Sequence, residues 1–135
     1  MQRIAFIGAG GITFAHKKAF LQHPSQLSVA GIADPNLDAA TKLAAELGKG
    51  IPVFADYKEM LASIKDRMDG VVITTPHFLH LPMASDVLNS GLPALVEKPV
   101  CCNTEELRLL HSLEKPGALC SSRTNATLRS RRELD

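Results

Sequence analysis

The sequence has 135 residues, of which 45% are hydrophobic and 21% are charged, and its formal net charge is +1. A chain of this length forms one domain with a substantial buried core and needs no disulfide or metal for its stability. The near-neutral charge excludes binding that depends on a general attraction to nucleic acid or to an anionic membrane. The function therefore has to be argued from individual sites.

The apolar runs are too short to span a bilayer, and the first three residues lead directly into a strand pattern rather than into a signal sequence. We therefore expect a cytoplasmic protein. The three cysteines are an odd number, and Cys101 and Cys102 are adjacent, which does not fit a disulfide framework. We expect them to be small buried residues in a reducing compartment.

Strand-like and helix-like patterns alternate along most of the chain. The expected strands lie at residues 3–7, 27–33, 53–54, 70–74, 94–96 and 118–122. The expected helices lie at residues 12–23, from Asp34 and Pro35 to 47, at 57–64, at 81–89, and from an Asn103–Glu106 capping pair to Pro116. This alternation predicts an α/β fold with a doubly wound parallel sheet and helices on both faces, the Rossmann class.

A glycine-rich turn follows the first strand over Gly8 to Thr13. Gly8 permits a tight turn, and Gly10 removes the Cβ that would keep a pyrophosphate away from the backbone. The N–H groups of such a turn, at the start of a helix, bind dinucleotide phosphates. Thr13 stands where glycine or alanine is usual, so the fingerprint is imperfect, and an ordinary strand-to-helix turn is the alternative.

Asp34 ends the second strand, where a dinucleotide-binding domain places a carboxylate that accepts hydrogen bonds from the adenosine ribose. Its charge would repel a 2′-phosphate. Charge-assisted bonds worth about 1.5–3 kcal/mol would then favour NAD over NADP by about one to two powers of ten. The alternative is that Asp34 is the N-cap of the helix that Pro35 opens, which is worth about 1 kcal/mol. The two roles are compatible.

Two further motifs follow the strands at 70–74 and 94–96. The first contains Thr75, Pro76 and His80, and the second is Glu97-Lys98-Pro99. Because ligands of open parallel sheets bind at the carboxyl ends of the strands, we expect these two strand ends to be neighbours in a ligand cleft.

In combination, GAGGITFAH (8–16), the TPxxxH pattern (75–80) and EKP (97–99) resemble the Gfo/Idh/MocA family, the relatives of glucose-fructose oxidoreductase and inositol dehydrogenase. The resemblance implies hydride transfer between NAD, or less favourably NADP, and a hydroxyl of a sugar, polyol or related compound. It implies Lys98 as the catalytic residue facing the substrate. The implied cofactor-binding residues are Gly8, Ala9, Gly10, Gly11, Ile12, Thr13, Asp34, Thr75, Pro76, His80 and Glu97.

The chemistry of Lys98 favours electrostatic positioning of the substrate. The ordinary pKa of a lysine, about 10.4, is too high for a general base near neutral pH unless the amine is desolvated or lies near positive charge. A carboxylate at Glu97 would oppose deprotonation. A plain surface lysine is the alternative.

A zinc site is the alternative for His77, His80, Cys101 and Cys102. We expect no metal, because the cysteines are adjacent rather than in a CxxC pair and the histidines belong to a strand-end loop.

Members of the resembled family carry a second, substrate-binding domain, and we expect this domain to be missing here. We expect residues 1–122 to form the dinucleotide-binding domain and residues 123–135 to form a basic helical tail at the start of the missing domain. Turnover by the chain alone is open, because positioning the reacting hydroxyl requires walls on both sides of the nicotinamide. The alternatives are an NAD-binding or interaction module without turnover, and a remnant that binds nothing well. A second copy or a protein partner would then cover the exposed substrate-side face.

Overall fold

The computed structural model describes residues 1–10, 13–97, 104–118 and 120–122. These residues form a six-stranded sheet in the order β3-β2-β1-β4-β5-β6, in which every neighbouring pair is parallel. The strands are β1 (Gln2–Ile7), β2 (Leu27–Ala33), β3 (Val53–Phe54), β4 (Gly70–Ile73), β5 (Ala94–Val96) and β6 (Cys120–Ser122). The helices are α1 (Thr13–Gln22), α2 (Leu37–Leu47), α3 (Tyr57–Ile64), α4 (His80–Asn89) and α5 (Thr104–Leu113), with 3-10 turns η1 (Lys65–Arg67) and η2 (His77–Leu79).

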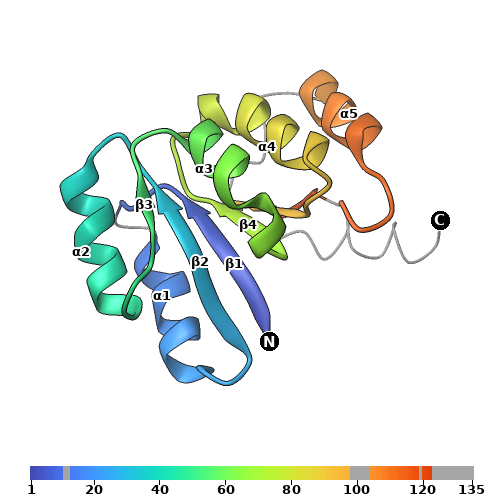
Figure 1. Cartoon of the computed structure of the whole chain (residues 1–135). Helices are drawn as coiled ribbons and strands as arrows, with labels where there is room; N and C mark the ends of the chain where they lie inside the picture. The colour runs from blue at the N-terminus through green and yellow to red at the C-terminus, as the bar shows by residue number, and fades with distance from the viewer. Residues whose placement is uncertain (11–12, 98–103, 119, 123–135) are drawn as a thin grey trace.

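The helices cover both faces of the sheet, with α1 and α2 on one side and α3, α4 and α5 on the other (Figure 1). Successive side chains of a strand point to opposite faces. Phe6 and Val72 accordingly pack toward α1 and α2, whereas Ile7 and Ile73 belong to the core beneath α3 and α4. The predicted doubly wound α/β fold is therefore confirmed.

β4 occupies the centre of the sheet, and all four of its residues are buried, as the uninterrupted apolar run predicts. β1 pairs with β2 on one side and with β4 on the other, so the strand order reverses beside β1. The ends of β4 and β5 are neighbours, as predicted. Backbone bonds extend this pairing beyond the strands: the N–H of Thr74 donates to Ile7 O (2.9 Å), and that of Glu97 donates to Ile73 O (3.0 Å). Three strand ends therefore lie together at one edge.

The capping prediction for Asp34 is wrong. Helix α2 begins at Leu37, and its N-cap is Asn36, whose side chain accepts from the Ala39 N–H at 3.2 Å. The Asp34 carboxylate instead accepts from the N–H groups of Ala9 and Asn36, and Asn36 caps the helix two residues later.

The end of α5 also differs from the prediction, because the helix stops at Leu113 rather than continuing to Pro116. Lys115 instead forms an isolated bridge with Ala118, a turn that leads into β6. Pro116 disfavours a helical conformation at the residue before it, which explains the early end. Asn103, the predicted cap, and the predicted basic tail at 123–135 lie outside the described residues.

Among the described helices, none combines the length and the apolar character that a crossing of the membrane requires.

Candidate functional site

The turn after β1 depends on Gly8. Its φ of +109° is a conformation that side-chain-bearing residues rarely adopt. A Cβ at this position would lie 2.6 Å from Thr74 Oγ1 and 3.1 Å from the carbonyl carbon of Thr74. Gly8 is therefore required both for the direction of the chain and for the close approach of β1 and β4.

Gly10 lies in a different environment, because a Cβ there would meet no protein atom within 4 Å. The residue is exposed at the carboxyl edge of the sheet. Space beside a glycine backbone at the end of β1 suits a pyrophosphate, which the residues present could bind through backbone N–H groups. Gly11 and Ile12 lie outside the described residues, and Thr13 opens α1.

Asp34 connects β2 to this turn. Its Oδ2 accepts from the Ala9 N–H at 2.8 Å, and its Oδ1 accepts from the Asn36 N–H at 2.8 Å. The carboxylate is half-buried, and it lies directly beside the glycine turn. A carboxylate next to a phosphate-binding turn is where an adenosine ribose would be bound. Because the N–H of Gly8 also donates to Ala33 O at 2.8 Å, two N–H groups of the turn already have acceptors within the protein.

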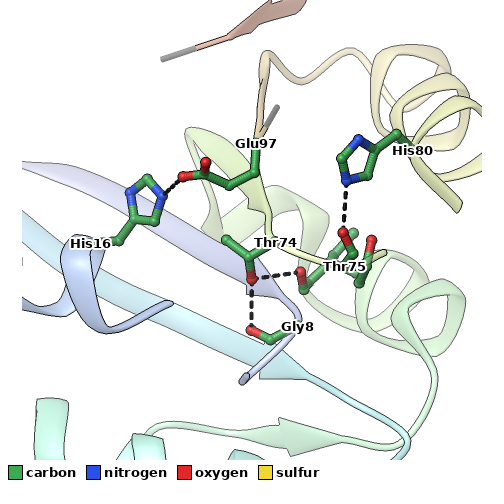
Figure 2. Close-up of polar contacts among 7 residues, drawn as sticks. Gly8, His16, Thr74, Thr75, His80 and Glu97 are labelled. Carbon is green, nitrogen blue, oxygen red and sulfur yellow. Dashed lines mark hydrogen bonds and ion pairs between the residues drawn. The ribbon is translucent and has the colours of Figure 1, made fainter. Parts of the chain in front are cut away.

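Thr74 joins the end of β4 to the glycine turn (Figure 2). Its buried hydroxyl donates to the carbonyl oxygens of Gly8 (3.3 Å) and Ile7 (3.4 Å). The next residue, Thr75, directs its hydroxyl to the sulfur of Met83 at 3.2 Å, while Pro76 is exposed. The first residue after β4 thus fixes the loop, and the following two lie at its surface.

His80 is almost completely buried, with 1% of its surface exposed. Its Nε2 lies 2.8 Å from the carbonyl oxygen of Thr75 (Figure 2). Because a carbonyl oxygen only accepts, Nε2 is the donor and carries the proton. His80 therefore supports the backbone of the loop after β4 from the protein interior. The cofactor contact that the sequence predicts for His80 would be indirect, through Thr75.

Glu97 follows β5 and is oriented by a residue of α1. Its Oε1 lies 2.5 Å from Nε2 of His16, and the two side chains are 13% and 11% exposed (Figure 2). His16 also lies against Phe6, with ring centroids 6.3 Å apart. The sequence places His16 one turn beyond the glycine turn, but nothing local indicates a partner 81 residues away. Lys98, the predicted catalytic residue, lies outside the described residues.

Within the part of the chain that the structure describes, no three His, Cys, Asp or Glu side chains gather closely enough to hold a metal ion. Cys101 and Cys102, which belong to the zinc alternative, are outside that part. The expected absence of a metal stays a prediction.

A groove of about 330 Å³ lies between α1 and the strands β1, β4 and β5. Its lining is mostly apolar, includes Phe20, and reaches the amino ends of the strands at Gln2, Gly70 and Ala94. The glycine turn is at the opposite end of the strands. The groove touches the candidate site only through His16, so we do not assign the dinucleotide to it.

Comparison with known proteins relates this geometry to a family. A family model described as "Oxidoreductase family, NAD-binding Rossmann fold" matches residues 2–123. The rhizopine catabolism protein MocA of Rhizobium meliloti is 33% identical over 106 residues, which are 78% of this chain and 32% of that protein. Inositol 2-dehydrogenase of Corynebacterium glutamicum (strain R) is 30% identical over 118 residues, which are 84% of this chain and 34% of the enzyme. The chain thus spans about a third of the length of these curated relatives.

Solved structures share the fold. GenD2 from gentamicin A biosynthesis, crystallised with NAD, is similar with a TM-score of 0.80 and 27% identity, over 90% of this chain and 34% of that one. The WlbA dehydrogenase from Bordetella pertussis, crystallised with NADH and UDP-GlcNAcA, has a TM-score of 0.78 and 27% identity, over 98% of this chain and 41% of that one.

Proposed function

The chain belongs to the Gfo/Idh/MocA family of NAD-binding oxidoreductases, and from this we propose that it supplies the cofactor-binding half of an enzyme that oxidises or reduces a hydroxyl-bearing carbon of a sugar, polyol or related compound. The predicted family and the predicted cofactor, NAD, are confirmed by the family match and by relatives crystallised with NAD or NADH. The reaction and the substrate class are the proposal. Relatives named for inositol and rhizopine metabolism support that class.

The observation that carries the proposal is the position of the Asp34 carboxylate, 2.8 Å from the Ala9 N–H of the glycine turn. This contact brings a ribose acceptor and a phosphate-binding turn to one place, with open space at Gly10. We call Gly8, Ala9, Gly10 and Asp34 the adenosine half of the site. The N–H groups of Gly8 and Ala9 already donate to Ala33 O and to Asp34. The pyrophosphate would therefore be bound at the open backbone of Gly10, and the ribose by the carboxylate.

We call Thr75, Pro76, His80 and Glu97 the nicotinamide half. Thr75 and Pro76 would contact the cofactor directly, while the buried ring of His80 fixes the Thr75 carbonyl by a hydrogen bond. Lys98, next to Glu97, would orient the substrate hydroxyl. A bound NAD would supply hydride-transfer chemistry at the carbon that carries this hydroxyl. The chain's own residues would orient the two reactants.

We further propose that another protein part, either a further domain, a second copy or a partner, covers the substrate side of this edge. Walls on both sides of the nicotinamide are needed to position a hydroxyl. Phe78, beside the nicotinamide half, is 66% exposed, which fits a surface that is completed by such a part.

We also propose a cytoplasmic location, because the buried thiol of Cys120 and the odd cysteine count fit a reducing compartment.

Calorimetric titration of the full chain with NAD, NADH and NADPH tests the proposal. We expect NADH to bind, and to bind about ten- to a hundredfold more tightly than NADPH. Binding of none of the three would overturn the proposal. If NADH binds, a screen of sugars and polyols for cofactor reduction then tests the reaction. Turnover that Lys98→Ala abolishes would establish the substrate-facing role of that lysine.

A further inference from the structure

The hydrogen bond between His16 and Glu97 connects two elements that carry different parts of the site. His16 lies on α1, the helix that follows the glycine turn, and Glu97 directly follows β5. The two side chains are 81 residues apart in sequence, and both are mostly buried. The contact therefore links the pyrophosphate-binding helix to the strand end that precedes Lys98.

Both partners are held from more than one side. The backbone N–H of Glu97 donates to Ile73 O at 3.0 Å, which fixes the main chain against β4. The ring of His16 lies against Phe6, which is itself fully buried in β1. The remaining freedom is the direction of the Glu97 side chain. A carboxylate with little exposed surface needs a donor, and His16 Nε2 provides one.

We propose that His16 is a positioning residue: it fixes the direction of the Glu97 carboxylate, at the end of β5, in the arrangement that receives the nicotinamide end of the cofactor. This role rests on the proposed function. Without the His16 donor, the mostly buried Glu97 carboxylate would lose the hydrogen bond that directs it toward α1. The Glu97 side chain would then lose its fixed direction, whereas the Asp34–Ala9 contact would remain.

The separation of the two halves defines the ligands for a test. NADH occupies both halves, whereas ADP-ribose lacks the nicotinamide and depends mainly on the adenosine half. A loss of positioning at Glu97 should weaken the binding of NADH and affect ADP-ribose much less. A general loss of folding would weaken both ligands equally.

The experiment is calorimetric titration of the full chain and its variants with NADH and with ADP-ribose, together with thermal unfolding. We expect His16→Ala to weaken NADH binding about tenfold and ADP-ribose binding less than about threefold. His16→Gln, whose amide nitrogen lies close to the position of Nε2, should restore NADH binding to within about threefold of the wild type. His23→Ala, at an exposed histidine just beyond α1, is the matched control and should change neither affinity.

A double-mutant cycle with Glu97→Gln checks that the two residues act together. If they do, His16→Ala combined with Glu97→Gln weakens NADH binding by less than the product of the single effects. Wild-type affinity for NADH in His16→Ala, or equal losses for NADH and ADP-ribose, would overturn the inference. If His16→Ala does not fold, Glu97→Gln takes its place. A larger loss for NADH than for ADP-ribose in Glu97→Gln, with NADH binding by His16→Gln close to the wild type, would support the inference, and equal losses for the two ligands would overturn it. A wild-type chain that binds neither ligand would instead contradict the proposed function.

Discussion

The two halves of the site are held in place by different means. In the adenosine half, the backbone conformation of Gly8 and two backbone N–H groups that donate to Asp34 set the geometry. In the nicotinamide half, side chains do this work: the ring of His80 holds the Thr75 carbonyl, and His16 holds Glu97. A pyrophosphate needs only backbone donors, which many sequences can supply. The proposed nicotinamide half combines the residues that follow β4 with those that follow β5. Mostly buried side chains hold these two segments in place.

The comparison predicts that the largest single effect comes from Gly8→Ala. The new Cβ would lie 2.6 Å from Thr74 Oγ1, and the backbone φ of +109° would be strained. We expect a loss of stability of about 2–4 kcal/mol and no measurable binding of NADH. Urea unfolding and calorimetry measure the two effects.

Gly50→Ala is the matched control, because Gly50 also has a positive φ of +72° but a Cβ there would meet no atom within 4 Å. It should cost about 1–2 kcal/mol and leave NADH binding intact. Equal losses in the two variants would show that backbone strain alone accounts for Gly8, without the approach of β4.

The next effect is that of Asp34→Ala on cofactor choice. We expect NADH binding to weaken by about ten- to a hundredfold, and the preference against NADPH to disappear, because the carboxylate no longer binds the ribose or repels a 2′-phosphate. Calorimetry with both cofactors measures this. Asp56→Ala, which removes the cap of α3, is the control: it should lower stability without changing the preference. If Asp34→Ala keeps the preference for NADH over NADPH, Asp34 does not bind the ribose, and its role is limited to the hydrogen bonds with Ala9 and Asn36.

His80→Leu addresses the nicotinamide half. The change removes the donor to Thr75 O inside the protein, so we expect a loss of about 1–2 kcal/mol in urea unfolding. NADH binding should fall more than ADP-ribose binding, since the loop after β4 loses its support. The same substitution at the exposed His23 provides the reference. If the two leucine variants unfold alike, the buried contact of His80 contributes nothing to the loop.

The smallest effect is expected away from the edge, at Tyr57. Its hydroxyl donates to Asp86 Oδ2 at 2.6 Å between α3 and α4. Burial, followed by the hydrogen bond to Asp86, raises the pKa of the Tyr57 phenol. The folded state therefore favours the protonated phenol, and this stabilisation is present below the ordinary pKa of about 10 and is lost as the pH rises above it.

Tyr57→Phe should therefore cost about 0.5–1 kcal/mol at neutral pH, and the stabilities of variant and wild type should converge above about pH 10. Urea unfolding across this pH range measures the difference. NADH affinity should not change. A change would mean that contacts far from both halves control cofactor binding, and the distinction between the halves would fail.

Local patterns in the sequence predicted most of the fold. The strand at 27–33 and the helix at 57–64 have the predicted bounds, because apolar periodicity and breakers such as Pro and Gly act within a few residues. The failures also have local causes. Asn36 rather than Asp34 caps α2, and α5 ends before Pro116, because a residue before a proline is disfavoured in the helical conformation.

The candidate site divides in the same way. The sequence by itself determined the glycine turn, the carboxylate of Asp34 and the motifs after β4 and β5, since each depends on a strand end and the residue type that follows it. Only the tertiary structure decided that β1 lies between β2 and β4, that a Cβ at Gly8 would collide with Thr74, and that His16 meets Glu97. These contacts join residues far apart in the chain, and packing of the whole sheet, rather than any local propensity, brings them together.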